Sequence, residues 1–261
     1  MKFDVLTLFP ELIEQSFNTS ITKRAMDDGI ITLNTVNIRD YTLDKHGKVD
    51  DYIFGGGAGM LIKSQPVYDA YKSLEVPKDT RVIYLTPVGK VFNQNIAKEL
   101  SKEKELVFLC GHYEGIDERV IDTIVTDRIS IGDYVLTGGE LPALIVMDAV
   151  SRLVSGVLGN DESSVDESFS DNLLEYAQYT RPNEWNNISV PDILLSGDHK
   201  KIDEYRLEES IKRTKMYRPD LYEIWATNHP EYFEKLEKKK KKLEEKLKKA
   251  QKKLAIKEQV W

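Results

Sequence analysis

Cysteine is almost absent from this sequence, since its 261 residues contain only Cys110. A single thiol excludes an internal disulfide and any metal cluster held by cysteines. Histidine is also scarce, with four residues in the chain, and no Ser-His-Asp order is recognisable. Covalent acyl chemistry therefore has no support, and His112 is better interpreted as a structural or surface residue than as a general base or metal ligand. We accordingly predict no metal site.

Long apolar runs are missing as well. No stretch reaches the roughly 20 residues that a membrane-spanning helix needs. The first residues, Met1 to Asp4, enter a strand-like pattern directly, which argues against a signal peptide and favours a cytoplasmic protein without a membrane partner. With 41% hydrophobic and 31% charged residues the composition is typical of a globular chain, and the length suffices for one large domain or two ordinary ones.

The net charge of −7 is unevenly distributed along the chain. The residues from Glu231 onward contain 12 Lys and 6 Glu, a net charge of +6, so the part before Glu231 carries −13. An acidic body does not by itself suggest a nucleic-acid partner. Any contact with RNA needs local basic patches, and the Lys-rich end of the chain is one candidate.

Short apolar runs alternate with helical patterns in the first part of the chain. The runs are Phe3–Leu8, Ile30–Val36, Val82–Leu85, Leu106–Cys110 and Ile129–Leu136. Helical patterns lie between several of them, at Pro66–Leu74 and Asn93–Leu100. The alternation predicts an α/β domain with a mostly parallel sheet over residues 1–159. By itself it favours an open, unknotted sheet, because knots are nearly absent among folds.

Three of these runs end in residues suited to a ligand pocket. The three ends are Leu85-Thr86-Pro87, Cys110–Gly115 and Ile131–Glu140. Sheets of this class bind ligands at the carboxyl ends of their parallel strands, so the agreement of three ends predicts one pocket. The third end closes with Gly138 and Gly139 directly before an amphipathic helical pattern. Glycine has no Cβ atom to keep the backbone away from a ligand.

The glycine cluster Gly55–Met60 is less informative. The residues before it, Asp50–Phe54, make a poor strand, so the cluster is not a good dinucleotide fingerprint, and it lacks the Lys-Ser/Thr pair of a P-loop. A flexible glycine loop is the favoured interpretation, although a flat base can still lie against such a loop. After the Cys110–Gly115 turn, Asp117-Glu118-Arg119 is predicted to open a helix, where acidic residues suit the helix dipole.

The composition changes after Gly159. Residues 160–172 are rich in Asp, Glu and Ser and are predicted to be a flexible linker or lid. Residues 173–235 are predicted to form a small, mainly helical domain. Within it we expect a helix from Ile202 to Met216, with Leu207, Ile211 and Met216 on one side.

Residues 236–261 form a Lys-rich tail with a helical pattern. Apolar residues recur at seven-residue spacing in two interleaved series, which is the pattern of a helix seam. The two series are Leu236, Leu243, Ala250 and Leu247, Leu254, Trp261. Because Lys240 and Lys257 interrupt the seam, we do not expect a long coiled coil. A solvated helix that packs on its own domain, a dimerising helix and an RNA-binding helix all remain open.

Several blocks of the sequence together resemble one known family. They are Gly55–Met60 after Asp50-Asp51, Cys110–Arg119, Ile131–Glu140 and Tyr179-Thr180-Arg181-Pro182. In order and spacing the chain is similar, from Phe3 to about Leu221, to the bacterial tRNA (guanine-37 N-1)-methyltransferases, the TrmD family. The resemblance implies a SPOUT-class fold with a deep trefoil knot that holds S-adenosylmethionine, and a homodimer with its active site at the interface. It also implies a helical domain that binds the tRNA anticodon loop, and magnesium assistance in turnover.

Methylation at N-1 of guanine requires particular catalytic groups. N-1 carries a proton at neutral pH, so the reaction needs a base to remove it and a cation or donor to hold the charge that develops on O-6. By resemblance the family's arginine corresponds to Arg152 and its aspartate base to Glu167. Glutamate is one methylene longer, and the adjacent Asp166 is the alternative base by a one-residue shift. Asn172 is a further departure, since glycine is usual there.

The resemblance assigns the cofactor pocket to the three strand ends and the glycine pair. The expected cofactor-binding residues are Leu85, Pro87, Gly111, Tyr113, Glu114, Ile131, Gly132, Asp133, Tyr134, Val135, Leu136, Gly138 and Gly139. The candidates for phosphate contacts are Arg181, Lys200, Lys201 and Arg206. Two alternatives stay open beside methylation of guanosine 37: methylation of another RNA atom, such as a ribose hydroxyl, and a tRNA-binding homologue with weakened catalysis.

Overall fold

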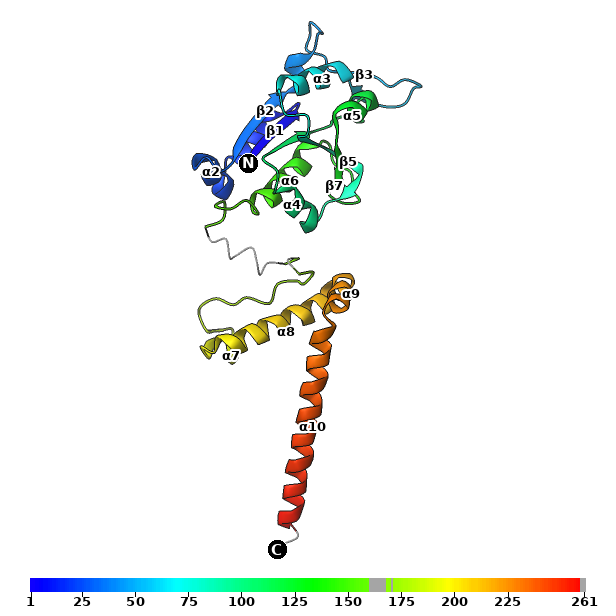
Figure 1. Ribbon diagram of the computed structural model, residues 1–261. Helices are drawn as coiled ribbons and strands as arrows, with labels where there is room; N and C mark the ends of the chain where they lie inside the picture. The colour runs from blue at the N-terminus through cyan, green and yellow to red at the C-terminus, as the bar shows by residue number, and fades with distance from the viewer. Residues whose placement is uncertain (160–167, 170, 259–261) are drawn as a thin grey trace. The chain divides into compact units, whose positions relative to one another are not determined.

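The computed structural model describes residues 1–159, 168–169 and 171–258 (Figure 1). The chain divides into two compact units, Met1–Val165 and Asp166–Trp261. The predicted linker over residues 160–172 falls largely outside the described residues. Within the described ranges, none of the helices combines the length and the apolar character that crossing a membrane requires.

A parallel sheet of five strands forms the centre of the first unit. In spatial order the strands are β2 (Thr32–Asn37), β1 (Lys2–Thr7), β6 (Glu105–Leu109), β5 (Arg81–Val91) and β7 (Asp127–Ser130). Every neighbouring pair runs parallel. The α/β class and the parallel sheet that the alternating pattern predicts are therefore confirmed.

Helices cover both faces of this sheet. The helices on one face are α1 (Pro10–Phe17), α2 (Ser20–Asp27), α4 (Gln94–Leu100) and α6 (Glu140–Ser151). Those on the other face are α3 (Ser64–Ser73), α5 (Glu118–Ile124) and the 3-10 helix η1 (Ile38–Tyr41). Strand residues alternate between the two cores, with Phe3 and Val5 in the first and Leu6 in the second. Because both faces are buried, the inner strands β5 and β6 contain the continuous apolar runs Val82–Leu85 and Leu106–Leu109.

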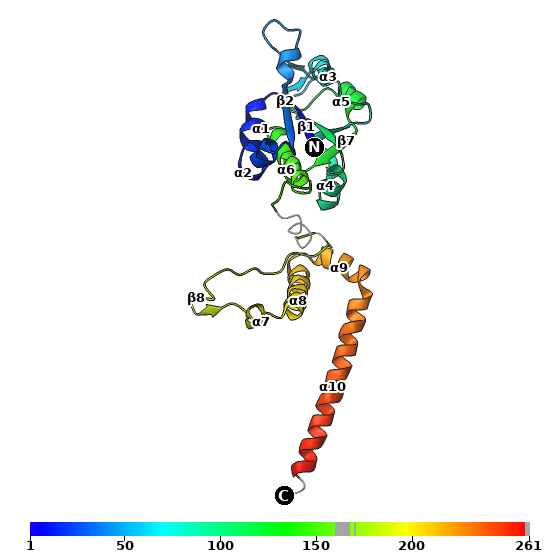
Figure 2. The ribbon, with the colours of Figure 1, turned by 60° about the vertical axis from the view of Figure 1, so that its left-hand side comes forward.

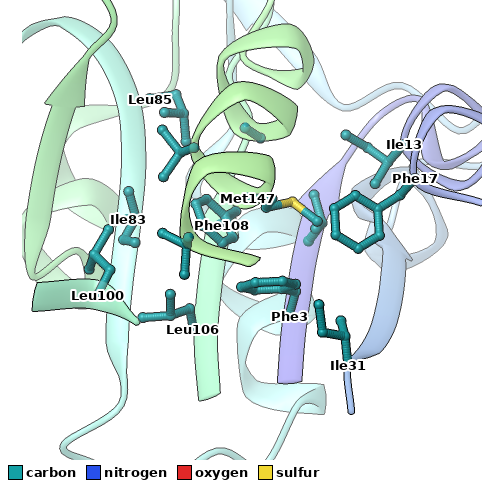
Figure 3. Packing of buried hydrophobic residues seen from close by; sticks show 14 of the residues in the cluster. Phe3, Ile13, Phe17, Ile31, Ile83, Leu85, Leu100, Leu106, Phe108 and Met147 are labelled. Atoms are coloured by element: carbon teal, nitrogen blue, oxygen red, sulfur yellow. The ribbon is translucent and has the colours of Figure 1, made fainter. Parts of the chain in front are cut away.

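Aromatic side chains occupy the centre of the first core (Figure 3). Phe3 packs edge to face against Phe17 and Phe108, with ring centroids 5.9 Å apart in both pairs. Met147 of α6 is fully buried in the same cluster. The helix that follows the glycine pair is therefore fixed against the middle of the sheet.

The start of α5 is confirmed, because the Asp117 carboxylate accepts a hydrogen bond from the Arg119 N–H and caps the helix. Two strand predictions are wrong. The run Ile129–Leu136 is not a strand throughout, since β7 ends at Ser130 and the chain then turns at Gly132, where φ is +139°. Conversely, Asp50–Tyr52 does form a strand, β3, because pairing with a partner strand outweighs its weak local propensity.

The second unit is mainly helical (Figure 2). Its first regular element is a hairpin of β8 (Glu184–Trp185) and β9 (Ile188–Ser189). The helices that follow are α7 (Asp192–Leu195), α8 (His199–Tyr217), α9 (Pro219–Asn228) and α10 (Pro230–Glu258). α10 runs without interruption through the end of the predicted helical domain into the Lys-rich tail.

The helix predicted over Ile202–Met216 is confirmed within α8, but its buried side differs from the expectation. Ile211 is buried as expected, but Leu207 is 42% exposed and Met216 is 68% exposed, whereas Thr214 is fully buried. The Thr214 hydroxyl donates to the Ser210 carbonyl at 2.6 Å. This bond satisfies a buried polar group, so apolarity alone did not identify the packed face.

Candidate functional site

A cavity of about 250 Å³ lies at the carboxyl ends of β6 and β7 and beside Tyr84–Pro87, where the regular pairing of β5 with β7 is interrupted after Leu85. Residues from three separate segments meet there, because parallel strands bring their carboxyl ends to one edge of the sheet. The lining residues are Tyr84, Leu85, Thr86, Pro87, Gly111, His112, Tyr113, Glu114, Gly115, Ile129, Ser130, Ile131, Gly132, Tyr134, Val135, Leu136, Thr137, Gly138, Gly139 and Pro142.

The glycine pair brings two segments into backbone contact beside the cavity. The Gly139 N–H donates to the Gly111 carbonyl at 2.9 Å. A Cβ atom on Gly139 would lie 2.8 Å from Cys110 Cα, and one on Gly138 would lie 2.4 Å from His112 Nε2. Neither position has room for a side chain, so the close approach explains why glycine is present at both.

The segment after β7 leaves the sheet in a tight turn. The Gly132 N–H donates to the Ser130 hydroxyl at 3.2 Å, and that hydroxyl donates to the Gly132 carbonyl at 3.1 Å. Beyond this turn Tyr134, Val135 and Leu136 are 54%, 86% and 40% exposed. The rim of the cavity therefore presents apolar side chains that a flat ligand or another protein surface can cover.

A buried carboxylate lies behind the cavity. Glu140 is 4% exposed; its Oε1 accepts a 2.7 Å hydrogen bond from the Thr7 hydroxyl, and its Oε2 lies 3.5 Å from His112 Nε2. The His112 ring also packs against Phe9, with centroids 4.8 Å apart. Burial raises the pKa of the Cys110 thiol well above its ordinary value, and Glu140 raises it further, so this thiol stays protonated and is no nucleophile.

Tyr84 contributes a polar group to the cavity wall. It is buried, and this burial raises the pKa of its phenol, with a smaller contribution from the charge of Glu118. A Cβ atom on Gly111 would lie 3.1 Å from the Tyr84 hydroxyl oxygen. The phenol therefore remains neutral at physiological pH and is packed directly against the glycine turn.

The glycine cluster connects β3 to β4 (Met60–Ile62) and lies against a cavity residue. Gly59 has a φ of +86°, and a Cβ atom on it would lie 2.4 Å from Glu114 Cγ. The Glu114 N–H donates to the Met60 carbonyl at 3.0 Å. The sequence assigned no ligand to this glycine loop. In the structure the loop contacts Glu114, which lines the cavity.

Residues 1–224 match the protein family described as tRNA (Guanine-1)-methyltransferase TrmD. The chain belongs to this family.

Several relatives named tRNA (guanine-N(1)-)-methyltransferase are similar over most of their length. The Lachnospira eligens protein is 57% identical over 235 residues, which cover 89% of this chain and 100% of that protein. The Clostridioides difficile protein is 59% identical over 225 residues, 85% of this chain and 97% of that protein. The Staphylococcus carnosus protein is 58% identical over 221 residues, 85% of this chain and 90% of that protein.

Every residue that the TrmD resemblance assigns to the cofactor pocket lines the cavity, with the exception of Asp133. Asp133 lies in the same turn but does not line the cavity. The cavity also includes Tyr84, Ser130 and Pro142, which the sequence did not single out. Tyr84 directly precedes Leu85 within β5, Ser130 is the last residue of β7, and Pro142 follows the glycine pair, so these positions were the available signal.

The predicted catalytic residue Arg152 does not line this cavity. Arg152 is the C-cap residue of α6, so the 12 residues of that helix separate it from the glycine pair. At 1.5 Å per residue this is about 18 Å. The segment after it packs near α2, where the Arg24 side chain donates to the Val157 carbonyl at 3.1 Å. Asp166 and Glu167 lie outside the described residues.

The residues that follow these carboxylates are anchored within the second unit. The Glu175 N–H donates to the Ser168 hydroxyl at 3.0 Å. Asp171 Oδ2 accepts a hydrogen bond from Trp225 Nε1 at 3.2 Å and lies 3.3 Å from His229 Nε2. Because Trp225 is only 2% exposed, it gives this segment a fixed point of attachment.

The second unit also contains Asn172 and the basic residues that were predicted to contact phosphate. Asn172 has a φ of +57°, in the left-handed region where asparagine is the best substitute for glycine. Arg206 lies over the Tyr176 ring at 4.8 Å, and Lys201 pairs with Asp198 at 2.8 Å. The phosphate contacts expected of these two basic residues, and of Arg181 and Lys200, stay predictions.

Proposed function

We propose that the chain transfers the methyl group of S-adenosylmethionine to N-1 of the guanosine at position 37 of tRNA. Membership of the TrmD family makes it a tRNA (guanine-N1)-methyltransferase, and this class implies S-adenosylmethionine as the donor. The cavity supports the assignment of the cofactor site, because it is concave and lies at the carboxyl edge of a parallel sheet. Position 37 rests on the resemblance of the sequence blocks.

The residues around the cavity fit this donor. Main-chain N–H and C=O groups of the three segments offer hydrogen bonds to an adenine edge, and Ile131, Val135 and Leu136 offer apolar contacts to its faces. Gly138 and Gly139 keep side chains out of the space beside them. Bound here, S-adenosylmethionine supplies a methyl group on a positively charged sulfur.

The chain itself supplies proton transfer and charge stabilisation. Glu167 takes the N-1 proton of guanine, with Asp166 as the alternative base, and Arg152 holds the negative charge that develops on O-6. N-1 then forms its bond to the methyl carbon as the carbon–sulfur bond breaks. The proton ends on the carboxylate, so no covalent enzyme intermediate is needed.

The position of Arg152 carries the proposal of an active site shared by two protomers. Leu141, Ile145, Asp148 and Arg152 follow each other on α6 at intervals of four, three and four residues, and so share one face. On this face Leu141 is 51% exposed and Ile145 is 48% exposed. A twofold contact between antiparallel α6 helices buries these apolar residues and brings each Arg152 toward the cavity of the other protomer.

The cavity volume also favours a site that a second protomer completes. About 250 Å³ is slightly below the roughly 300–1,000 Å³ of typical small-molecule pockets. The exposed rim residues Tyr134, Val135 and Leu136 are available for that contact. The dimer therefore explains two features of the isolated chain, the open rim and the distant arginine.

The remaining parts of the proposal rest on the resemblance. They are the trefoil knot, a lid over residues 160–172, a tRNA-binding helical domain over residues 173–235 and a cytoplasmic location, which the tRNA substrate favours. Magnesium assistance belongs here too. In the described part of the chain no three His, Cys, Asp or Glu side chains gather into a group that could hold a metal ion.

Methyl transfer to two RNA transcripts tests the function. Radiolabelled S-adenosylmethionine is supplied with a tRNA transcript that has guanosine at positions 36 and 37, and with its guanosine-37→adenosine version. We expect label in the first transcript only, because the second has no guanine N-1 at position 37. Label in both transcripts would mean that another RNA atom is methylated. Label in neither would identify a weakened tRNA-binding homologue.

Mixed dimers of two inactive variants test the shared active site. When Gly139→Ala and Arg152→Gln chains are coexpressed, half of the dimers are mixed, and each mixed dimer has one site with an intact cavity and an intact arginine. Activity should return to about a quarter of the wild-type value. If each site is formed within one chain, every site in the mixture carries a defect and no activity returns.

A further inference from the structure

The long helix α10 lies outside the part of the chain that matches the family, because the match ends at residue 224. Its start is fixed by aromatic packing, since the Trp225 ring centroid lies 5.2 Å from that of Tyr232 and 6.2 Å from that of Phe233. Beyond the half-buried Leu236, the described side chains of α10 are exposed. In both ribbon views the C-terminal end of α10 extends away from α8 and α9 (Figures 1 and 2).

Lysines form a continuous row along one face of α10. Lys235, Lys239, Lys242 and Lys246, here called the lysine row, follow each other at intervals of four, three and four residues and are all exposed. Such intervals keep residues on one face of an α-helix, with successive lysines about 5 Å apart along its axis. The sequence continues the same spacing at Lys249.

Nearby acidic groups compensate the lysine row only weakly. Lys239 Nζ lies 3.7 Å from Glu204 Oε2, but the two side chains are 67% and 54% exposed. An ion pair so open to solvent contributes little binding energy and leaves the lysine available. The residues from Glu231 onward carry +6 against −13 in the rest of the chain, so α10 concentrates the positive charge that the acidic body lacks.

We propose that the lysine row binds the phosphodiester backbone of the tRNA substrate. This inference rests on the proposed function, because tRNA is the polyanion that the enzyme must hold. The lysine ammonium is a compact charge that binds phosphate without demanding one geometry. The row therefore adds sequence-independent affinity through the release of counterions, and it reads no bases.

A second copy of the chain explains α10 less well. Leu236 and Leu247 belong to a possible seam, but Lys240 and Lys257 interrupt it. Each copy carries +6 in this segment, so pairing brings like charges together. A paired helix explains the leucines, whereas it leaves outward lysines such as Lys242 without a role.

Charge removal in the full-length chain tests the proposal. In the row variant, Lys239, Lys242 and Lys246 are all replaced by Gln, which preserves helix propensity. The measurement is the affinity for the tRNA transcript between about 50 and 200 mM salt. We expect weaker binding and a salt slope reduced by about one for each lysine, hence by about three. Turnover at saturating tRNA should stay unchanged.

A matched control removes the same charge from other faces of the helix. In it Lys240, Lys241 and Lys248, which lie outside the row, are replaced by Gln. We expect a clearly smaller change in salt slope than in the row variant. Equal losses in both variants would overturn the proposal, because net charge and not the row would then govern binding.

The test also separates the competing explanations. Unchanged tRNA binding in the row variant, together with a particle mass that falls when Leu247 is replaced by Ala, would assign α10 to a contact between copies and overturn the proposal. If the wild-type chain fails to methylate guanosine 37 while the row and control variants still differ in salt slope, the proposed reaction fails and the RNA contact stands. If methylation is normal and both variants bind tRNA alike, the proposed reaction stands and the RNA contact of the lysine row fails.

Discussion

In the first unit the cavity is shaped by backbone, whereas in the second unit the exposed helix faces carry charge. A Cβ atom on Gly139 would meet the backbone of Cys110 and Gly111 at 2.8 and 3.0 Å. Lys239 and Lys246 on α10 are exposed, so their side chains are not confined by neighbouring backbone. We infer that the first unit is sensitive to the volume of single side chains, and that the second responds to summed charge and to salt.

The largest effect expected from this difference is that of Gly139→Ala. The added Cβ meets backbone atoms that cannot move cheaply, so we expect the loss of measurable S-adenosylmethionine binding and a fall in turnover of at least about 10²-fold. Titration calorimetry checks the binding. Gly159→Ala is the matched control, because nothing lies within 4 Å of a Cβ there. Normal cofactor binding by Gly139→Ala would break the comparison.

The next effect separates chemistry from cofactor binding. Glu167→Gln keeps the size of the side chain but cannot accept the guanine proton, so single-turnover methyl transfer should slow by about 10²–10⁴-fold. S-adenosylmethionine affinity should be unchanged, since the pocket belongs to the first unit. Asp166→Asn is the control and should retain most activity. Loss of activity in Asp166→Asn alone would reassign the base to Asp166.

A moderate effect is expected from the anchor behind these carboxylates. Asp171→Ala removes the acceptor for Trp225 Nε1 and the neighbour of His229, and so loosens the segment that follows the base. We expect a turnover number reduced by about tenfold with unchanged cofactor affinity. Glu208→Ala removes an exposed carboxylate of α8 and serves as control. Equal turnover in both variants would show that the anchor does not position the base.

The smallest effect concerns the stability of the first unit in acid. Burial raises the pKa of Asp127, but hydrogen bonds from Arg81 and Thr126 outweigh burial and hold this pKa below its ordinary value. A carboxyl with a lowered folded pKa stabilises the protein above its unfolded pKa, and this contribution is lost as the pH falls through the folded pKa. Arg81→Gln should therefore reduce the free energy of unfolding at pH 7 by about 1–2 kcal/mol, allowing for solvent screening.

Thermal unfolding of the wild type and Arg81→Gln at neutral and acidic pH checks this effect. The difference between the two proteins should shrink as the pH falls and Asp127 becomes protonated. Arg119→Gln is the comparison variant, because it removes the partner of Asp117 at an exposed position, and its effect should be smaller. A difference that persists unchanged in acid would mean that Arg81 stabilises the unit by packing and not through its charge.

Much of the first unit could be predicted because its signals are local. A carboxylate that caps its own helix, as Asp117 does for α5, needs only neighbouring residues. The second unit was harder to predict, because the buried side of α8 includes Thr214, whose polarity is satisfied within the helix. The strand β3 was missed for a different reason: its pairing with β4 is a tertiary contact that local propensity does not show.

The sequence by itself determined the parallel sheet, the three segments that line the cavity, the glycine pair and the family. These features depend on periodicity, residue type and the order of motifs. Only the tertiary structure decided how distant residues meet, as when the Thr7 hydroxyl reaches Glu140 across 133 positions of the chain. It also placed Arg152 a helix length from the cavity that α6 helps to form. Contacts of this kind depend on how the whole sheet packs, and so no local pattern encodes them.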